Sequence, residues 1–224
     1  MANWFAYQQH NKQIKARKHR RVSDVLGSLV LIIVGVWLNI HFLNYYDIHP
    51  LGKEPLAWGT ETTTFFQPGV IHWEKKILSW ADTYDLDPLL IATVMQIESC
   101  GDPHAVSPAG AQGLFQVMPY HFQPEEDMLD PQTNAARGLT YLHKALNKSN
   151  GDIQLAMAGY NGGHTQIDRH PDRWPEETKR YVAWGWGIYQ DAKLGMTTGQ
   201  TLSAWLDAGG QHLCRQAEIS LGLH

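Results

Sequence analysis

The sequence lacks a convincing β-strand pattern and has no internal repeat. Charged residues are few, at 18%, while apolar residues make up 43%, so wholesale disorder is disfavoured and a packed core is expected. The 224 residues suffice for one sizeable domain or for one domain with appendages. We therefore predict an all-α (mainly α) protein.

Two motifs for cofactor chemistry are also missing. No HExxH or comparable metal spacing occurs, so the polar stretch that contains His164, Asp168, His170 and Asp172 is predicted to be a loop rather than a metal site. The Gly110-x-x-Gly113 pattern lacks the Lys-Ser/Thr of a phosphate loop, which excludes nucleotide binding there. We expect neither a metal nor another cofactor.

No charged residue occurs between Val25 and Tyr46, and this run is long enough for the roughly 20 residues that cross a bilayer as a helix. Six Lys and Arg residues precede it within residues 1–24, which predicts a cytoplasmic N-terminus. A cleaved signal peptide and a nucleic-acid patch are alternatives. Against cleavage, the run is long and no A-x-A-like site follows. We expect a basic tail (1–24), an uncleaved anchor (25–46), no nucleic-acid binding, and everything after the anchor outside the cytoplasmic membrane.

The chain has only two cysteines, Cys100 and Cys214. Outside the cytoplasm a disulfide between them is permitted, but two unpaired thiols are an open alternative. Cys100 and His104 would also suit a thiol nucleophile, although nothing else in the sequence fits such an enzyme.

Proline and glycine mark the helix boundaries. Residues 47–68 resemble a spacer, and apolar residues recur at helical spacing from Gly69 to Tyr84. Asp87-Pro88 and Asp130-Pro131 each have the form of an N-cap followed by proline at the first helical position. Further helices are expected at 153–160 and 176–192. The tail, 194–224, predicts two short helices joined at Gly209-Gly210 that either cap the domain or dock a partner.

Glu98 ends the apolar helix that Asp87-Pro88 opens, where the negative end of the helix dipole disfavours an anion. A carboxyl group that is partly buried there would have a raised pKa and would keep its proton near neutral pH. Such a group can donate a proton to a leaving oxygen, as the acid of a glycosidase does. The alternative is a surface glutamate at a helix end.

The residues around Glu98 resemble the SLT domain of the lytic transglycosylases, in the lysozyme-like superfamily. Four blocks match that signature in the family's order, over roughly residues 70–192. They are Glu98-Ser99 with Ala105-Val106-Ser107 and Gly110-Ala111-Gln112-Gly113-Leu114-Phe115-Gln116-Val117-Met118-Pro119; Asn134, Gly138 and Tyr141-Leu142; Gly159-Tyr160-Asn161-Gly162-Gly163; and Glu177-Thr178-Lys179-Arg180-Tyr181-Val182.

The resemblance implies a lysozyme-like helical domain at 69–193 that cleaves the β-1,4 bond between N-acetylmuramic acid and N-acetylglucosamine in peptidoglycan. Glu98 would act first as acid and then as base, so that the C6 hydroxyl of the muramic acid forms a 1,6-anhydro product. Ordinary glycosidases need a second carboxylate. The nearest acids, Asp102 and Asp130, look like turn and cap residues, so the pattern favours the anhydro route.

The same resemblance implies substrate-binding residues around Glu98. These are Ser107, Gln116, Met118, Tyr160, Asn161 and Glu177. Three of them have structural alternatives: Tyr160 as a packing residue, Ser107 as a turn residue, and Glu177 as an acid in the first turn of a helix.

Two rival functions share parts of this pattern. A goose-type lysozyme would use the same acid but hydrolyse the bond with water. A membrane-tethered wall-binding component of a secretion or conjugation apparatus would not need catalysis, although an intact Glu98 argues against it. The expected location is a single-pass protein of the bacterial cytoplasmic membrane, with peptidoglycan strands as its partner on the outer side.

Overall fold

The structure is a computed structural model that describes residues 65–223. Over this range the chain is helical, and the only β pairing is a set of isolated bridges that join Val106, Gln112 and Val117. The main helices are α2 (Pro68–Ile71), α3 (Glu74–Tyr84), α4 (Pro88–Glu98), α5 (Pro131–Lys148), α6 (Ile153–Gly162), α7 (Glu176–Lys193), α8 (Gln200–Trp205) and α9 (Gln211–Leu221). The predicted helical character is thus confirmed for the described part of the chain.

The predicted basic tail (1–24), membrane anchor (25–46) and most of the spacer (47–68) lie outside the described residues. Within 65–223, none of the helices combines the length and the apolar character that a bilayer crossing needs.

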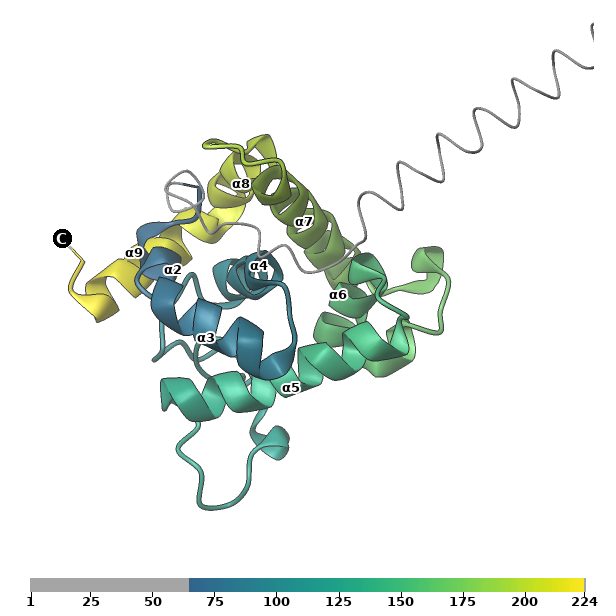
Figure 1. The fold of residues 1–224 in the computed structure, drawn as a ribbon, viewed down its shortest axis with the longest axis horizontal. Coiled ribbons are helices and arrows are strands. Elements are labelled where there is room, and N and C mark those ends of the chain that lie inside the picture. The colour runs from purple at the N-terminus through teal and green to yellow at the C-terminus, as the bar shows by residue number, and fades with distance from the viewer. Residues whose placement is uncertain (1–64, 224) are drawn as a thin grey trace, which may run out of the picture. The chain divides into compact units, whose positions relative to one another are not determined.

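Helix α4 lies in the middle of the other helices (Figure 1). The Asp87 carboxylate accepts a hydrogen bond from the backbone N–H of Leu89 at 2.9 Å, and Pro88 takes the first helical position, as predicted. Every residue from Leu89 to Gln96 is buried. A fully buried aliphatic side chain contributes about 1.5–3 kcal/mol, so this helix is fixed by core packing.

Asp87 also links α4 to α7. Its second carboxylate oxygen accepts hydrogen bonds from the Tyr189 hydroxyl at 2.8 Å and from Lys193 Nζ at 3.2 Å. Asp130 repeats the capping arrangement at α5, where it accepts from the backbone N–H of Thr133 at 2.7 Å. Both proline-opened helices therefore begin where the sequence predicts.

The helical spacing over 69–84 is divided between two helices, α2 and α3, which are separated at His72 and Trp73. The Trp73 indole N–H donates to the Gly101 carbonyl at 2.8 Å. Gly69 packs so closely on this loop that an added Cβ would lie 2.3 Å from the Cys100 carbonyl oxygen. The break thus brings the start of the domain against the loop that follows Glu98.

The C-terminal tail packs onto the domain. Helices α8 and α9 are joined by a π-helical turn, Leu206–Gly210, in which Gly209 has a φ of 129°. Cys214 on α9 forms a disulfide with Cys100, with their Cα atoms 4.9 Å apart, which decides between the two cysteine alternatives. Gln96 Nε2 lies 3.0 Å from the sulfur of Cys100 and 3.4 Å from that of Cys214. The tail thus packs on the domain, as a capping role requires, while docking of a partner stays an untested alternative.

Replacing both cysteines (Cys100→Ser with Cys214→Ser) should lower the free energy of unfolding by about 2–5 kcal/mol, because the bond closes a long loop. The bonded residues are 114 positions apart. Urea denaturation measures the effect. A reducing agent should destabilise the wild type and leave the double variant unchanged; equal stability of the two proteins in the absence of reductant would contradict the prediction.

Candidate active site

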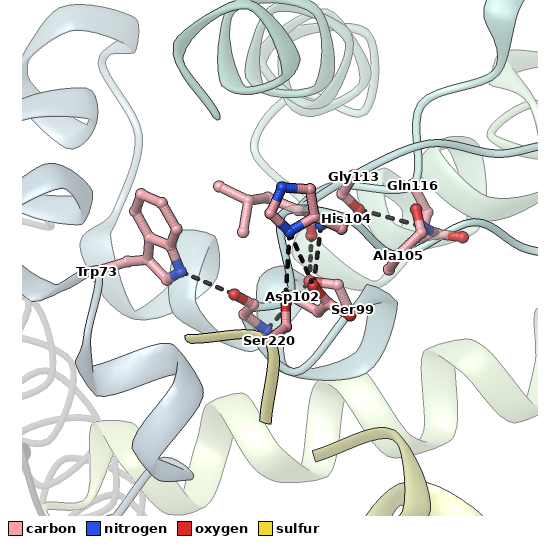
Figure 2. A network of polar contacts seen from close by, with 10 residues as sticks. Trp73, Ser99, Asp102, His104, Ala105, Gly113, Gln116 and Ser220 are labelled. Carbon is pink, nitrogen blue, oxygen red and sulfur yellow. Dashed lines mark hydrogen bonds and ion pairs between the residues drawn. The ribbon is translucent and has the colours of Figure 1, made fainter. Parts of the chain in front are cut away.

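The loop that follows Glu98 is held by Ser99. The Ser99 hydroxyl donates to the Leu114 carbonyl at 2.7 Å and accepts from the Gly101 N–H at 3.1 Å. Positive φ values at Cys100 (52°) and Gly101 (89°) turn the chain sharply away from the helix axis. Figure 2 shows Ser99 and Trp73 close to this turn. The end of α4 is therefore fixed to the loop around Leu114, and this loop forms one wall of the pocket that Glu98 lines.

That wall is a folded loop fastened by side-chain amides. Gln116 Nε2 donates to the carbonyls of Ala105 and Gly113, both at 3.1 Å (Figure 2). The buried Asn134 of α5 accepts from the Phe115 N–H at 2.9 Å. Its Nδ2 donates to the Gln112 carbonyl at 2.7 Å and to the Met128 carbonyl at 2.9 Å.

Glycine is required at position 113. Its φ is 68°, and an added Cβ would lie 2.6 Å from Asn134 Nδ2. The glycine of the Gly-x-x-Gln pattern (Gly113 to Gln116) therefore serves the backbone geometry of the wall.

Glu98 faces a pocket of about 470 Å³ that this loop forms with α5, α6 and α7. All seven residues that the sequence singled out as catalytic or substrate-binding line it. They are Glu98, Ser107, Gln116, Met118, Tyr160, Asn161 and Glu177. The structure thus brings together residues that are up to 79 positions apart in the chain; their roles stay predictions.

Burial governs the chemistry of Glu98. The residue keeps partial exposure toward the pocket, but protein surrounds its carboxyl group, and this desolvation raises its pKa to about 8. The negative charge of Glu177 raises the pKa further, while the Tyr181 hydroxyl lowers it in part. Glu98 is therefore protonated at neutral pH, as the sequence argument required of a general acid.

Two tyrosines flank the carboxyl group. The Tyr160 hydroxyl donates to the Phe115 carbonyl at 2.7 Å, so its proton is engaged and its oxygen remains as an acceptor. The buried Tyr181 hydroxyl has no partner with hydrogen-bond geometry within 65–223, yet it is close enough to affect Glu98. Burial, followed by the charge of Glu98, raises the pKa of both phenols well above 10. The Tyr181 phenol therefore keeps its proton and can donate it in a hydrogen bond when Glu98 is ionised.

The remaining predicted residues combine local and pocket roles. The Ser107 hydroxyl accepts from the Ala111 N–H at 3.0 Å, which is the turn role considered for it. The Asn161 side-chain oxygen accepts from Thr178 Oγ1 at 2.9 Å and so connects α6 to α7. Glu177 is exposed in the first turn of α7, where the positive end of the helix dipole favours an anion.

Asp102 and Asp130, the acids considered as partners for Glu98, do not line the pocket. Asp102 is buried and accepts from the His104 N–H at 2.9 Å, near Ser220 of the tail (Figure 2), while Asp130 caps α5. Glu177 is the one acid besides Glu98 in the lining. Within residues 65–223 no group of three His, Cys, Asp or Glu side chains is arranged to hold a metal ion.

Sequence reasoning assigned no role to several residues at this site. Tyr181 and Tyr141 lie inside the matched blocks, so their positions in those motifs were an available signal. Tyr120 and His121 line the pocket from the short helical turn Pro119–His121, directly after the matched Met-Pro. Only their aromatic character could have suggested them.

The segment that forms this site is similar in sequence to known proteins. Residues 75–182 match the family model described as the Transglycosylase SLT domain. This segment is similar to SLT domains. It contains α4 with Glu98, the wall loop, α5, α6 and the first part of α7.

Curated relatives cover the same region. A transglycosylase of Enterobacteria phage PRD1 is 35% identical over 115 residues, covering 50% of this chain and 41% of that protein. The membrane-bound lytic murein transglycosylase E of Buchnera aphidicola is 36% identical over 93 residues, covering 35% and 44%. The chain thus spans less than half the length of these relatives. A solved lytic transglycosylase Slt from Pseudomonas aeruginosa is 24% identical over 57% of this chain and 25% of that chain, with a TM-score of 0.45, a likeness too distant to carry an argument.

The raised pKa of Glu98 predicts how Glu98→Gln changes stability with pH. The folded protein keeps this proton up to about pH 8, whereas the unfolded chain releases it near the ordinary value of 4.5. Wild-type stability therefore falls between these values as pH rises. The Gln variant lacks this loss, so it should unfold several degrees higher than the wild type at pH 9 and at a similar temperature at pH 4. Thermal unfolding across pH measures the difference in unfolding temperature between the variant and the wild type. A difference that does not depend on pH would contradict the raised pKa.

Proposed function

We propose that the SLT domain is a peptidoglycan lytic transglycosylase of lysozyme-like type, which cleaves the β-1,4 bond between N-acetylmuramic acid and N-acetylglucosamine. One observation carries this proposal: Glu98 lines the pocket with its carboxyl group surrounded by protein, which raises its pKa to about 8. The matched SLT family and the names of the relatives support the substrate class.

In the proposed reaction Glu98 donates its proton to the glycosidic oxygen as the bond to C1 of the muramic acid breaks. The resulting Glu98 carboxylate then takes the proton of the C6 hydroxyl, whose oxygen bonds to C1 and closes the 1,6-anhydro ring. The proton is thus returned and no water is consumed. A group that serves in turn as acid and base needs a pKa near the working pH, and desolvation provides it here.

Neighbouring residues would assist each state of Glu98. The Tyr181 hydroxyl, which has no hydrogen-bond partner among residues 65–223, can donate to the carboxylate that exists between the two proton transfers. The side-chain amide nitrogen of Gln116 donates both of its hydrogen bonds to protein, to the carbonyls of Ala105 and Gly113. Its side-chain oxygen is then available to accept from a sugar N–H or hydroxyl in the pocket.

Glu98→Gln should abolish muropeptide release from purified sacculi, with a fall of at least about 1000-fold, because the amide can neither give nor take the proton. The expected thermal unfolding temperature at pH 5 is close to that of the wild type, which makes the comparison one of chemistry rather than folding. Glu218→Gln, on the tail helix, is the matched control and should retain release. Wild-type rates in Glu98→Gln would refute the proposed role.

A goose-type hydrolase remains the second candidate because Glu177, a second carboxylate, lines the same pocket. In that enzyme Glu177 would activate a water molecule. Mass spectrometry of the released fragments distinguishes the two: an anhydro product is lighter than the hydrolytic product by one water.

We expect anhydro products from the wild type, and we expect Glu177→Gln to slow release without changing the product, because the variant removes the charge that helps to raise the pKa of Glu98. Reducing-end products that disappear in Glu177→Gln would assign hydrolysis instead.

We also propose that the enzyme acts at the outer side of a bacterial cytoplasmic membrane, held by the apolar run at 25–46 with the basic residues inside. The name of the Buchnera relative describes that protein as membrane-bound. Service to a secretion or conjugation apparatus stays a prediction from sequence.

A further inference from the structure

A continuous row of rings runs along one wall of the pocket. Tyr120 and His121 have ring centroids 4.5 Å apart, and His121 lies 4.8 Å from Tyr141. Tyr141 in turn makes an edge contact of 5.9 Å with Tyr160, the tyrosine beside Glu98. All four residues line the pocket, so the row leads from its outer part to the proposed acid.

The inner part of the row is held in place by His164, which packs against Tyr141. His164 stacks on Tyr141 with ring centroids 4.1 Å apart and an angle of 17° between the planes, and its Nε2 lies 3.2 Å from the Tyr141 carbonyl oxygen. Lys148 donates to the His164 carbonyl at 2.9 Å and pairs with Asp168 at 2.5 Å. The rings therefore form a preorganised wall, which lowers the entropic cost of binding.

The outer end of the row does not serve core packing. Tyr120 is 76% exposed although it lines the pocket, so its ring face is open to a ligand. His121 is half-buried, and burial followed by the charges of His164 and Lys144 lowers its pKa, which keeps the imidazole neutral at neutral pH. An open phenol next to a neutral imidazole offers an uncharged aromatic surface with polar edges.

The charges of the lining favour an uncharged ligand over an anionic one. No Lys or Arg is among the residues that line the pocket, whereas Glu98 and Glu177 are. The carboxylates of a peptide would meet no ion-pair partner there, and a negatively charged Glu177 would repel them. A pyranose ring suits the site better, because its C–H face can stack on an aromatic ring while its hydroxyl groups remain hydrated.

We infer that Tyr120 and His121 form a stacking site for an N-acetylated pyranose outside the pair of sugars whose bond is cleaved, so that they set how strongly binding depends on glycan length. This inference rests on the proposed function of the pocket. Tyr120 supplies the open ring face, and His121 holds that ring and connects it to the row. The expected contribution is that of one aromatic stacking contact, about three- to tenfold in affinity.

The test measures binding of β-1,4-linked N-acetylglucosamine oligomers, from two to six sugars, to the inactive full-length Glu98→Gln protein by calorimetry. Affinity should rise with length. Adding Tyr120→Ala should weaken binding of the longest oligomers about three- to tenfold and leave binding of the shortest unchanged. Tyr120→Phe keeps the ring, so it should retain the rise in affinity with oligomer length. Leu194→Ala is the matched control, because Leu194 is similarly exposed, at 74%, and lies outside the pocket.

Kinetics on sacculi with intact Glu98 provide the second readout. Tyr120→Ala should raise KM about three- to tenfold with little change in kcat, since the contact is present equally in the ground and transition states. The inference would be overturned if Tyr120→Ala and its parent bound oligomers of every length with equal affinity. It would also be overturned if Tyr120→Phe lost as much affinity as Tyr120→Ala. In either case, release of muropeptides by the wild type would leave the proposed function intact. Absence of oligomer binding at every length would overturn it as well. Absence of any wild-type product would instead refute the proposed function.

Discussion

The account depends on the burial of α4 along its whole length. Because the residues from Leu89 to Gln96 are all in the core, the helix cannot turn its last residue toward bulk water. Glu98 lines the pocket, and desolvation by the surrounding protein favours its neutral form. The helix dipole opposes an anion at this end as well. The same packing that stabilises the domain therefore produces a carboxylic acid that keeps its proton at neutral pH.

The wall opposite this acid is stabilised by contacts from two other helices and from the end of α4 itself. Asn134 of α5 binds the loop backbone at three points, Tyr160 of α6 binds the Phe115 carbonyl, and Ser99 after α4 binds the Leu114 carbonyl. A loop with so many buried partners holds a fixed shape without a sheet to support it. The disulfide from Cys100 adds the tail to this arrangement two residues after Glu98. The geometry of the candidate site and the stability of the domain therefore depend on the same contacts.

Local chemistry made some of this predictable. The Asp-Pro pairs gave the starts of α4 and α5 because capping is decided within a few residues. The resemblance identified seven residues that share one pocket. The division of the first helical stretch at Trp73 was not predictable, because it depends on a hydrogen bond to Gly101, 28 positions later. The effect of the Glu177 charge on Glu98 and the row of aromatic rings were likewise not predictable. Both depend on tertiary contacts between separate elements, which the spacing of residues in the sequence does not encode.

The most direct test of this account is the titration of Glu98 itself. Carbon-13 NMR of protein labelled at the glutamate carboxyl carbons follows each group through pH, and the resonance absent from Glu98→Gln identifies the residue. The account predicts that this one carboxyl titrates near pH 8, as desolvation requires. A Glu98 resonance that titrates near the ordinary value of 4.5 would contradict the central claim, because the group would then be a carboxylate at neutral pH with no proton to donate.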